Sequence, residues 1–160
     1  MAIQVGAKVP SVKVKVVRPE GTKDANTTEL FAGKKVVLFA VPGAFTPLCS
    51  AQHLPGFVTK ADEMRKKGVD EIFCLSVNDP WVMDAWGKDR GALDKVTLIA
   101  DGSGEFTKAV DLELDASGAG LGVRSQRYAA IIEDGVVKHL AVEKPMKFEV
   151  SSAEAVLGQL

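Results

Sequence analysis

Residues 36–57 read VVLFAVPGAFTPLCSAQHLPGF, and this stretch predicts a buried strand that leads directly into a helix carrying a cysteine. The six residues before Pro42 are all apolar, which is typical of a strand covered on both faces. The Pro-Gly pair ends that strand. Thr46 is then expected as the N-cap and Pro47 as the first helical residue, because proline's fixed φ and missing N–H suit that position. Cys49 therefore falls in the first turn of the helix.

A cysteine at that position is expected to be reactive. The first backbone N–H groups of a helix have no partner within it, and the helix dipole adds partial positive charge there, so the thiolate of Cys49 is favoured over the thiol. A Cys-x-x-Cys redox motif would carry a second cysteine where Thr46 stands, so no local disulfide is expected. The alternative is a buried cysteine that only fills space, as free cysteines often do.

Four blocks of the sequence resemble the peroxiredoxins. Pro42, Thr46 and Cys49 stand as in the Pro-x-x-x-Thr-x-x-Cys motif of that family, and the residues around them are similar to its type II, or peroxiredoxin-five-like, subfamily, above all to plant-type members. The other blocks follow in the family's order: CLSVNDPWVM (74–83), LIADGSGEF (98–106) and GLGVRSQRY (120–128). The resemblance covers nearly the whole chain. It implies a thioredoxin-like α/β fold, with a mixed central sheet flanked by helices.

The same resemblance implies a thiol peroxidase that reduces hydrogen peroxide and alkyl hydroperoxides through a sulfenic acid on Cys49, without a cofactor. By match to the family's fourth block, Arg124 is expected to contact the sulfur, while Arg127 is expected only to support it. A fixed guanidinium would stabilise a thiolate and polarise the peroxide oxygens. Thr46 is expected to help hold the peroxide, and Pro42 to shield the sulfur from water. From the residues alone, both arginines could equally be solvated surface.

The second cysteine, Cys74, lies in the middle of a predicted strand and is expected to be a buried filler. The alternative is that it resolves oxidised Cys49, but a disulfide requires Cα atoms within roughly 7 Å, so bridging would demand local unfolding. Some type II relatives resolve through a cysteine near the C-terminus, and residues 147–156 contain none. The resemblance to plant-type members therefore implies an external reductant, either glutaredoxin with glutathione or thioredoxin. It also implies a homodimer packed near the active site, with Trp81 in the interface.

Length and composition predict one soluble domain over residues 1–160. The chain is 46% hydrophobic with a formal net charge of −1, so neither nucleic acid nor an acidic membrane surface is expected as a partner. No apolar stretch reaches the length of a membrane span, and the N-terminal MAIQVGAKVP lacks the apolar core of a signal peptide. The cytoplasm is the expected location, and two cysteines in a chain of this length suit its reducing conditions.

The remaining elements follow from periodicity and turn residues. After the cysteine, a helix is expected to run to about Gly68 with a kink at Pro55, because proline removes a backbone hydrogen bond. Its first turn is then weakly tied to the rest, so an oxidised sulfur could leave its pocket. Further strands are expected at 12–16, as a sheet edge, and at 72–77 and 96–100, and a hairpin is expected at 128–133 and 136–142 around an Asp-Gly turn. Helices are expected at 27–31, from residue 79 onward, in a short segment that ends at residue 110, and from residue 152 onward.

Other sites and functions fit the sequence less well. The glycines at 118–122 are not followed by the Gly-Lys-Ser/Thr of a phosphate-binding loop. His53 could ligate a metal, but only His139 and Cys74 could complete a ligand set. We therefore expect His53 either to lie on the surface or to support a residue that contacts the sulfur. The alternative functions are a peroxide sensor or redox relay that passes oxidation to a partner protein, and a thioredoxin-fold binding module with a silent cysteine.

Overall fold

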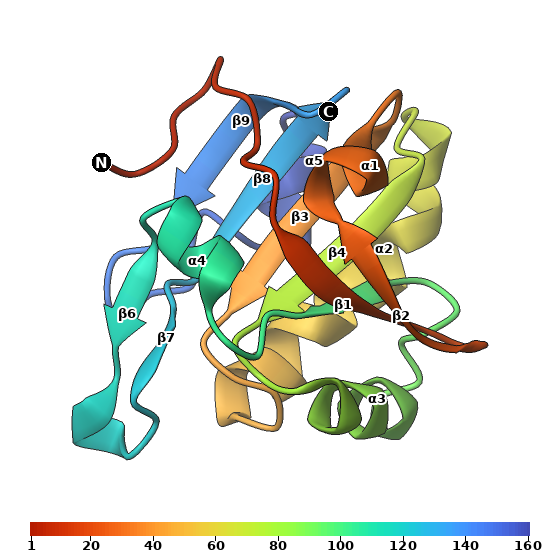
Figure 1. Ribbon diagram of the computed structural model, residues 1–160. Coiled ribbons are helices and arrows are strands. Elements are labelled where there is room, and N and C mark those ends of the chain that lie inside the picture. Colours follow the sequence, from red (N-terminus) through yellow and green to blue (C-terminus); the bar gives the residue numbers. More distant parts are fainter.

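A mixed seven-stranded sheet forms the centre of the computed structural model, which describes residues 1–160 (Figure 1). The strand order is β2-β1-β5-β4-β3-β8-β9, with β3, β4 and β5 parallel to one another and the other pairs antiparallel. The strands of this sheet are β1 (Lys13–Arg18), β2 (Gly21–Asn26), β3 (Lys35–Val41), β4 (Glu71–Ser76), β5 (Thr97–Ala100), β8 (Tyr128–Glu133) and β9 (Val136–Val142). The short strands β6 (Glu113–Asp115) and β7 (Val123–Ser125) form a separate ribbon.

Helices cover both faces of the sheet. On one face lie α2 (Leu54–Lys66), α3 (Pro80–Asp89) and α5 (Ala153–Leu157), and on the other lie α1 (Thr27–Phe31) and α4 (Glu105–Ala109). Two shorter helical turns are η1 (Cys49–His53) and η2 (Ser117–Ala119). The sheet is mixed and flanked by helices, as the sequence predicts.

The central strand β3 is buried along its length because every residue after Lys35 is apolar. Successive side chains of a strand point to opposite faces, so β3 contributes to two cores, one under α2, α3 and α5 and one under α1 and α4. The first set is Val37, Phe39 and Val41, and the second is Val36, Leu38 and Ala40. Full burial of such a side chain stabilises the fold by about 1.5–3 kcal/mol. The strand therefore holds its C-terminal end, where the cysteine loop begins, in a fixed position.

The first strand differs from the prediction. It was expected at a sheet edge, but β1 pairs with β5 on one side and with β2 on the other. The edge is β2, whose sequence GTKDAN has no apolar alternation because it is largely exposed and pairs on one side only. Residues 21–26 were not predicted to be a strand for that reason.

The C-terminal hairpin forms as predicted. Asp134 and Gly135 join β8 to β9 with positive φ angles of 48° and 77°, which is the backbone that an Asp-Gly turn supplies between antiparallel strands. Antiparallel pairing of β8 with β3 places Tyr128 opposite Ala40. The residue before Tyr128 therefore lies close to the end of β3.

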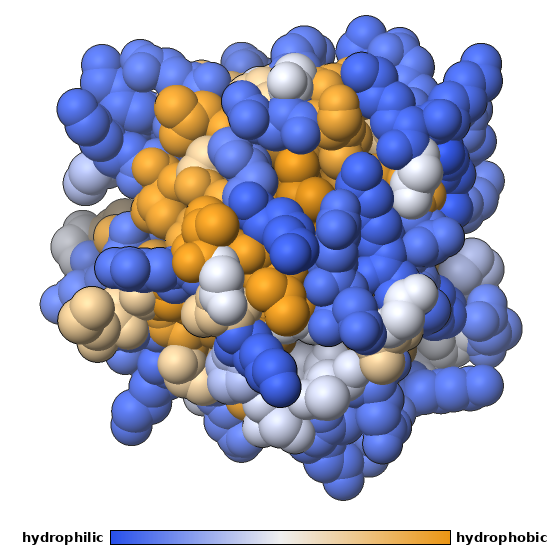
Figure 2. Space-filling model, turned by 90° about the horizontal axis from the view of Figure 1, so that it is seen from above, coloured by the Kyte–Doolittle hydropathy of each residue, from blue (hydrophilic) through white to orange (hydrophobic).

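The surface seen from above carries a hydrophobic patch near its middle, with hydrophilic residues around it (Figure 2). None of the helices combines the length and the apolar content that crossing a bilayer requires.

Candidate active site

The loop after β3 turns the chain into the cysteine helix. The Ser50 N–H donates to the Thr46 carbonyl at 3.0 Å, so the helical hydrogen bonds begin at Thr46, as the sequence predicts. The Thr46 hydroxyl does not cap the helix, however, and instead donates to the Gly43 carbonyl at 2.6 Å. With its proton engaged there, the Thr46 oxygen keeps its lone pairs as acceptors.

The predicted kink takes the form of a π-helical turn. Residues Cys49–His53 form η1, and the Leu54 N–H donates to the Cys49 carbonyl five residues back. Pro55 has no N–H, so the α-helical bond to the Ala51 carbonyl cannot form. Such turns are rare and often occur at functional sites. The first turn is therefore less tightly bonded to α2 than a continuous α-helix would be.

Cys49 is fully buried and contacts a guanidinium. The Arg127 Nη2 donates to Cys49 Sγ at 3.0 Å. A hydrogen bond from an ionised donor stabilises negative charge on the sulfur. The Trp86 indole N–H donates to the Ser50 hydroxyl at 2.8 Å, which ties the same helical turn to α3.

His53 lies on the other side of Arg127. Arg127 Nη1 lies 2.7 Å from His53 Nδ1, and His53 Nε2 lies 2.9 Å from the Ser151 carbonyl. An arginine only donates and a carbonyl only accepts, so Nε2 carries the proton and Nδ1 is the acceptor. Burial, together with the Arg127 charge, lowers the pKa of His53 from 6.5 to about 3. The ring is therefore neutral at physiological pH and can accept from Arg127. His53 thus supports the arginine that contacts the sulfur, which was one of the two roles predicted for it.

The expectation that Arg124 contacts the sulfur is wrong. Arg124 Nε donates to the Leu121 carbonyl at 2.9 Å and its Nη1 to the Pro42 carbonyl at 3.4 Å. Arg124 belongs to β7, in the small ribbon, whereas Arg127 directly precedes β8, whose first residues pair with the end of β3. That pairing brings Arg127 to the cysteine loop. The apolar run after Arg127 predicts strand β8, but only the pairing of β8 with β3 decides which arginine reaches the sulfur.

A cavity of about 370 Å³ opens beside these groups. Pro42, Thr46 and Arg127 line it, and most of the remaining wall comes from the segment at 143–147 together with Leu48 and Leu114. Two of the four predicted site residues, Pro42 and Thr46, therefore line the cavity. Cys49 is not part of its lining but contacts Arg127, which is, and Arg124 bonds to the backbone of Pro42.

Cys74 is fully buried in the same core as Cys49 and remains a free thiol. Burial, together with the proximity of Cys49, raises the pKa of Cys74 well above its usual value. A buried thiol that stays protonated is a poor nucleophile. This environment fits the expected role of filler.

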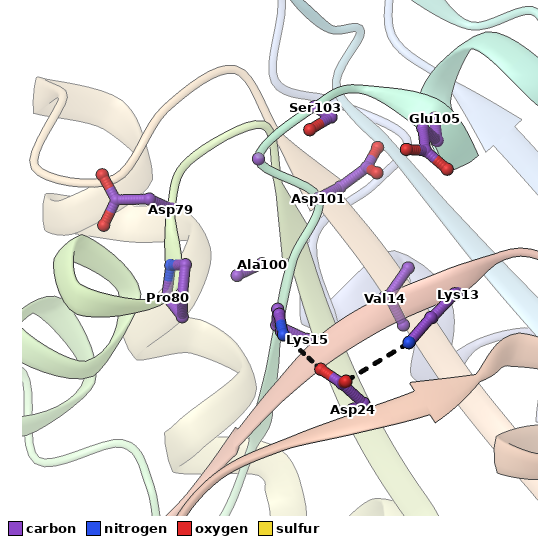
Figure 3. A pocket seen from close by; sticks show the side chains of 11 residues that line it. Lys13, Val14, Lys15, Asp24, Asp79, Pro80, Ala100, Asp101, Ser103 and Glu105 are labelled. Atoms are coloured by element: carbon purple, nitrogen blue, oxygen red, sulfur yellow. Dashed lines mark hydrogen bonds and ion pairs between the residues drawn. The ribbon is translucent and has the colours of Figure 1, made fainter.

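A second cavity, of about 570 Å³, is more polar and lies between β1, β2 and the start of α3 (Figure 3). Two of its acidic groups are already engaged: Asp24 pairs with Lys13 and Lys15, and the Asp101 carboxylate accepts from the Thr107 N–H and hydroxyl. Neither cavity has a cysteine in its lining, but Arg127, which contacts Cys49 Sγ, lines only the first. The cavity beside Arg127 is therefore the candidate site for thiol chemistry.

Comparison with known proteins agrees with this geometry. Residues 4–157 match the Redoxin family model. The chain is 52% identical to Peroxiredoxin-2E, chloroplastic, of Arabidopsis thaliana, over 99% of this chain and 70% of that protein.

This chain belongs to the peroxiredoxins.

Peroxiredoxin-2B of Arabidopsis thaliana is 54% identical, over 85% of this chain and 84% of that protein. The crystal structure of reduced Prx3 in complex with hydrogen peroxide, from Vibrio vulnificus, superimposes with a TM-score of 0.93 at 52% identity and covers 98% of each chain. The predicted thioredoxin-like fold and the type II resemblance are confirmed. This peroxiredoxin is a thiol-dependent peroxidase.

The relatives correct the expected cytoplasmic location. Peroxiredoxin-2E of Arabidopsis thaliana and a rice relative, 50% identical, are named chloroplastic, and Peroxiredoxin-2F of Arabidopsis thaliana, 44% identical, is named mitochondrial. Relatives of similar sequence thus occur in different compartments. The lack of a signal-peptide core and the cysteine count, on which the expectation rested, do not distinguish those compartments.

Proposed function

We propose that Cys49 is the peroxidatic thiol and that it reduces hydrogen peroxide and alkyl hydroperoxides. The observation that carries this proposal is the 3.0 Å contact between Arg127 Nη2 and Cys49 Sγ beside the 370 Å³ cavity. The sulfur attacks the terminal peroxide oxygen and the O–O bond breaks. The leaving oxygen takes a proton and departs as an alcohol or water, and the sulfur becomes a sulfenic acid. The Arg127 guanidinium stabilises the negative charge as it moves from sulfur to oxygen.

Two neighbours of the sulfur hold the peroxide in this proposal. The Thr46 hydroxyl donates to the Gly43 carbonyl, so its oxygen accepts the O–H of the bound peroxide and orients it toward the sulfur. Pro42 lines the cavity without offering an N–H and excludes water from the sulfur. Arg124 acts through its bond to the Pro42 carbonyl, as a support for the loop rather than a contact to the sulfur.

Regeneration requires an external thiol and a local opening. Cys49 has no exposed surface, so a reductant as large as glutathione or a protein can reach its sulfenic acid only when the first helical turn moves away. The π turn before Pro55 is the part of the helix that can open. The external thiol forms a mixed disulfide with Cys49, which a second thiol then reduces. Glutaredoxin with glutathione, or thioredoxin, supplies these thiols in this proposal.

The assembly proposed is a homodimer of one domain per chain. Trp81 is 81% exposed and Phe45 is 50% exposed. The Ala44 N–H donates to Asn78 Oδ1 at 3.0 Å, which joins the loop carrying Phe45 to the loop just before Trp81. Exposed aromatic side chains on adjoining loops fit an interface between two copies beside the active site. Sedimentation equilibrium of the reduced protein tests this, since a monomer at all concentrations would contradict it.

Intact-mass measurement after one equivalent of hydrogen peroxide tests the reaction sequence. Without added thiol, the mass is expected to rise by one oxygen atom, because Cys74 is buried inside strand β4 and its thiol stays protonated. With glutathione present, the mass is expected to rise by one glutathionyl group. Loss of two hydrogens, which marks a Cys49–Cys74 disulfide, would contradict the external reductant. An unchanged mass would contradict the peroxidase proposal itself.

A further inference from the structure

One buried carboxylate outside the catalytic group organises the C-terminal segment. Glu143 follows β9 and is 7% exposed. Its Oε2 accepts from the backbone N–H groups of Glu149, Val150 and Ser151 at 2.8, 2.9 and 2.8 Å, and from the Ser151 hydroxyl at 2.7 Å. Burial opposes the ionisation of Glu143, but these hydrogen bonds outweigh it and hold the pKa of this carboxyl below its usual value. Ionised Glu143 therefore holds together the two ends of the loop of residues 144–150.

The fastened loop contacts the catalytic arginine through His53. The Ser151 carbonyl accepts the His53 Nε2 proton at 2.9 Å, which leaves Nδ1 free to accept from Arg127 Nη1 at 2.7 Å. Phe148, inside the loop, packs edge-on against the His53 ring with centroids 4.9 Å apart, and the Arg127 guanidinium lies 5.9 Å from the Phe148 ring centroid. A continuous set of contacts thus runs from Glu143 to the guanidinium that touches the sulfur.

The same loop forms the outer wall of the cavity. Lys144, Pro145, Met146 and Lys147 line it, together with Pro42 and Thr46. Met146 is fully exposed and has a φ of 67°, a left-handed conformation that is unfavourable for its side chain and that persists only where neighbouring contacts hold the backbone. The four hydrogen bonds to Glu143 are contacts of this kind. The hydrogen bonds to Glu143 therefore fix both the orientation of Arg127 and the shape of the cavity wall.

We propose that Glu143 is a positioning residue of the peroxidase reaction, which holds the loop of residues 144–150 closed so that Ser151 and Phe148 keep His53 and Arg127 aimed at Cys49. This rests on the function proposed above and extends it by a carboxylate that bonds neither to the sulfur nor to the Arg127 guanidinium, while the Glu143 backbone N–H donates to the Arg127 carbonyl at 2.9 Å. Misplacing a catalytic group by about 1 Å can cost roughly 100-fold in rate, so loss of the hydrogen bonds to Glu143 should lower the reaction rate measurably.

Glu143→Gln tests the role, since the amide keeps the size of the side chain but removes the charge that four donors share. In the folded variant, the second-order rate constant with hydrogen peroxide is expected to fall roughly 10-fold. Glu154→Gln, an exposed carboxylate on α5, is the matched control and is expected to leave the rate unchanged. Ser151→Ala removes only one of the four hydrogen bonds and is expected to give a smaller loss, which keeps the test available if Glu143→Gln does not fold.

A double-mutant cycle separates positioning from general stability. If Glu143 acts through Arg127, adding Glu143→Gln to an Arg127→Gln background should cause no further loss of rate in folded protein. Equal losses in both backgrounds would overturn the proposal, as would a Glu143→Gln rate equal to that of Glu154→Gln. If the unmodified protein itself lacks peroxidase activity, the function proposed above fails, which is distinct from either result.

Discussion

Cys49→Ser is expected to lose peroxidase activity by at least about 10³-fold, because a serine hydroxyl is not ionised at neutral pH and cannot replace the attacking thiolate. The Arg127 contact supplies charge stabilisation but no nucleophile, so little activity should remain. The measurement is peroxide consumption with glutathione and glutaredoxin, and separately with thioredoxin, as the thiol supply.

Cys74→Ala is the matched control for this substitution. Both cysteines are fully buried in the same core, so each variant disturbs similar packing. Loss of the Cys74 sulfur is expected to lower the free energy of unfolding by about 1 kcal/mol and to change turnover only a few-fold. Retained turnover in Cys49→Ser, or an equal loss in Cys74→Ala, would show that the peroxidatic sulfur is wrongly assigned.

Arg127→Gln is expected to lower kcat/KM for hydrogen peroxide by about 10²–10³-fold. It removes the positive charge and the donor that lies 3.0 Å from Cys49 Sγ, and the burial of that sulfur increases the effect of such a donor. Arg127→Lys should not restore the rate, because one ammonium nitrogen cannot reproduce the two separate contacts of the guanidinium with the sulfur and with His53. Steady-state kinetics at fixed thiol supply measure both variants.

Arg124→Gln provides the comparison that separates the two arginines. Its guanidinium bonds are to the carbonyls of Leu121 and Pro42, so its loss loosens the loop without removing a contact to the sulfur. We expect a decrease of less than about 10-fold. If the Arg124 variant were the more damaged of the two, the assignment of Arg127 would be contradicted.

Local signals in the sequence predicted most of the fold. The apolar run of residues 36–41 predicted the doubly covered central strand, and the Asp134-Gly135 pair predicted the hairpin. The Thr46-Pro47 pair predicted where the cysteine helix begins. Strand β2 was missed because an exposed edge strand needs no apolar alternation, and β1 was therefore placed at the edge in error.

The site was less accessible to such reasoning because its contacts join residues far apart in the chain. Whether Arg124 or Arg127 reaches the sulfur depends on the pairing of β8 with β3, a register that the four letters RSQR do not contain. His53 follows Cys49 closely enough to be singled out, but its neutral state depends on burial and on Arg127, and its tautomer depends on Ser151, both far from it in the chain. Nothing in the local sequence indicates that Glu143 accepts from backbone N–H groups six to eight residues further on.

The second-order rate constant of reduced Cys49 with hydrogen peroxide at neutral pH, measured by stopped-flow in single turnover, tests the central claim most directly. Because Cys49 Sγ accepts from the Arg127 guanidinium, beside a cavity lined by Pro42 and Thr46, the rate constant is expected to exceed that of an unstructured cysteine peptide by at least about 10³-fold. A rate constant equal to that of the peptide would contradict the account.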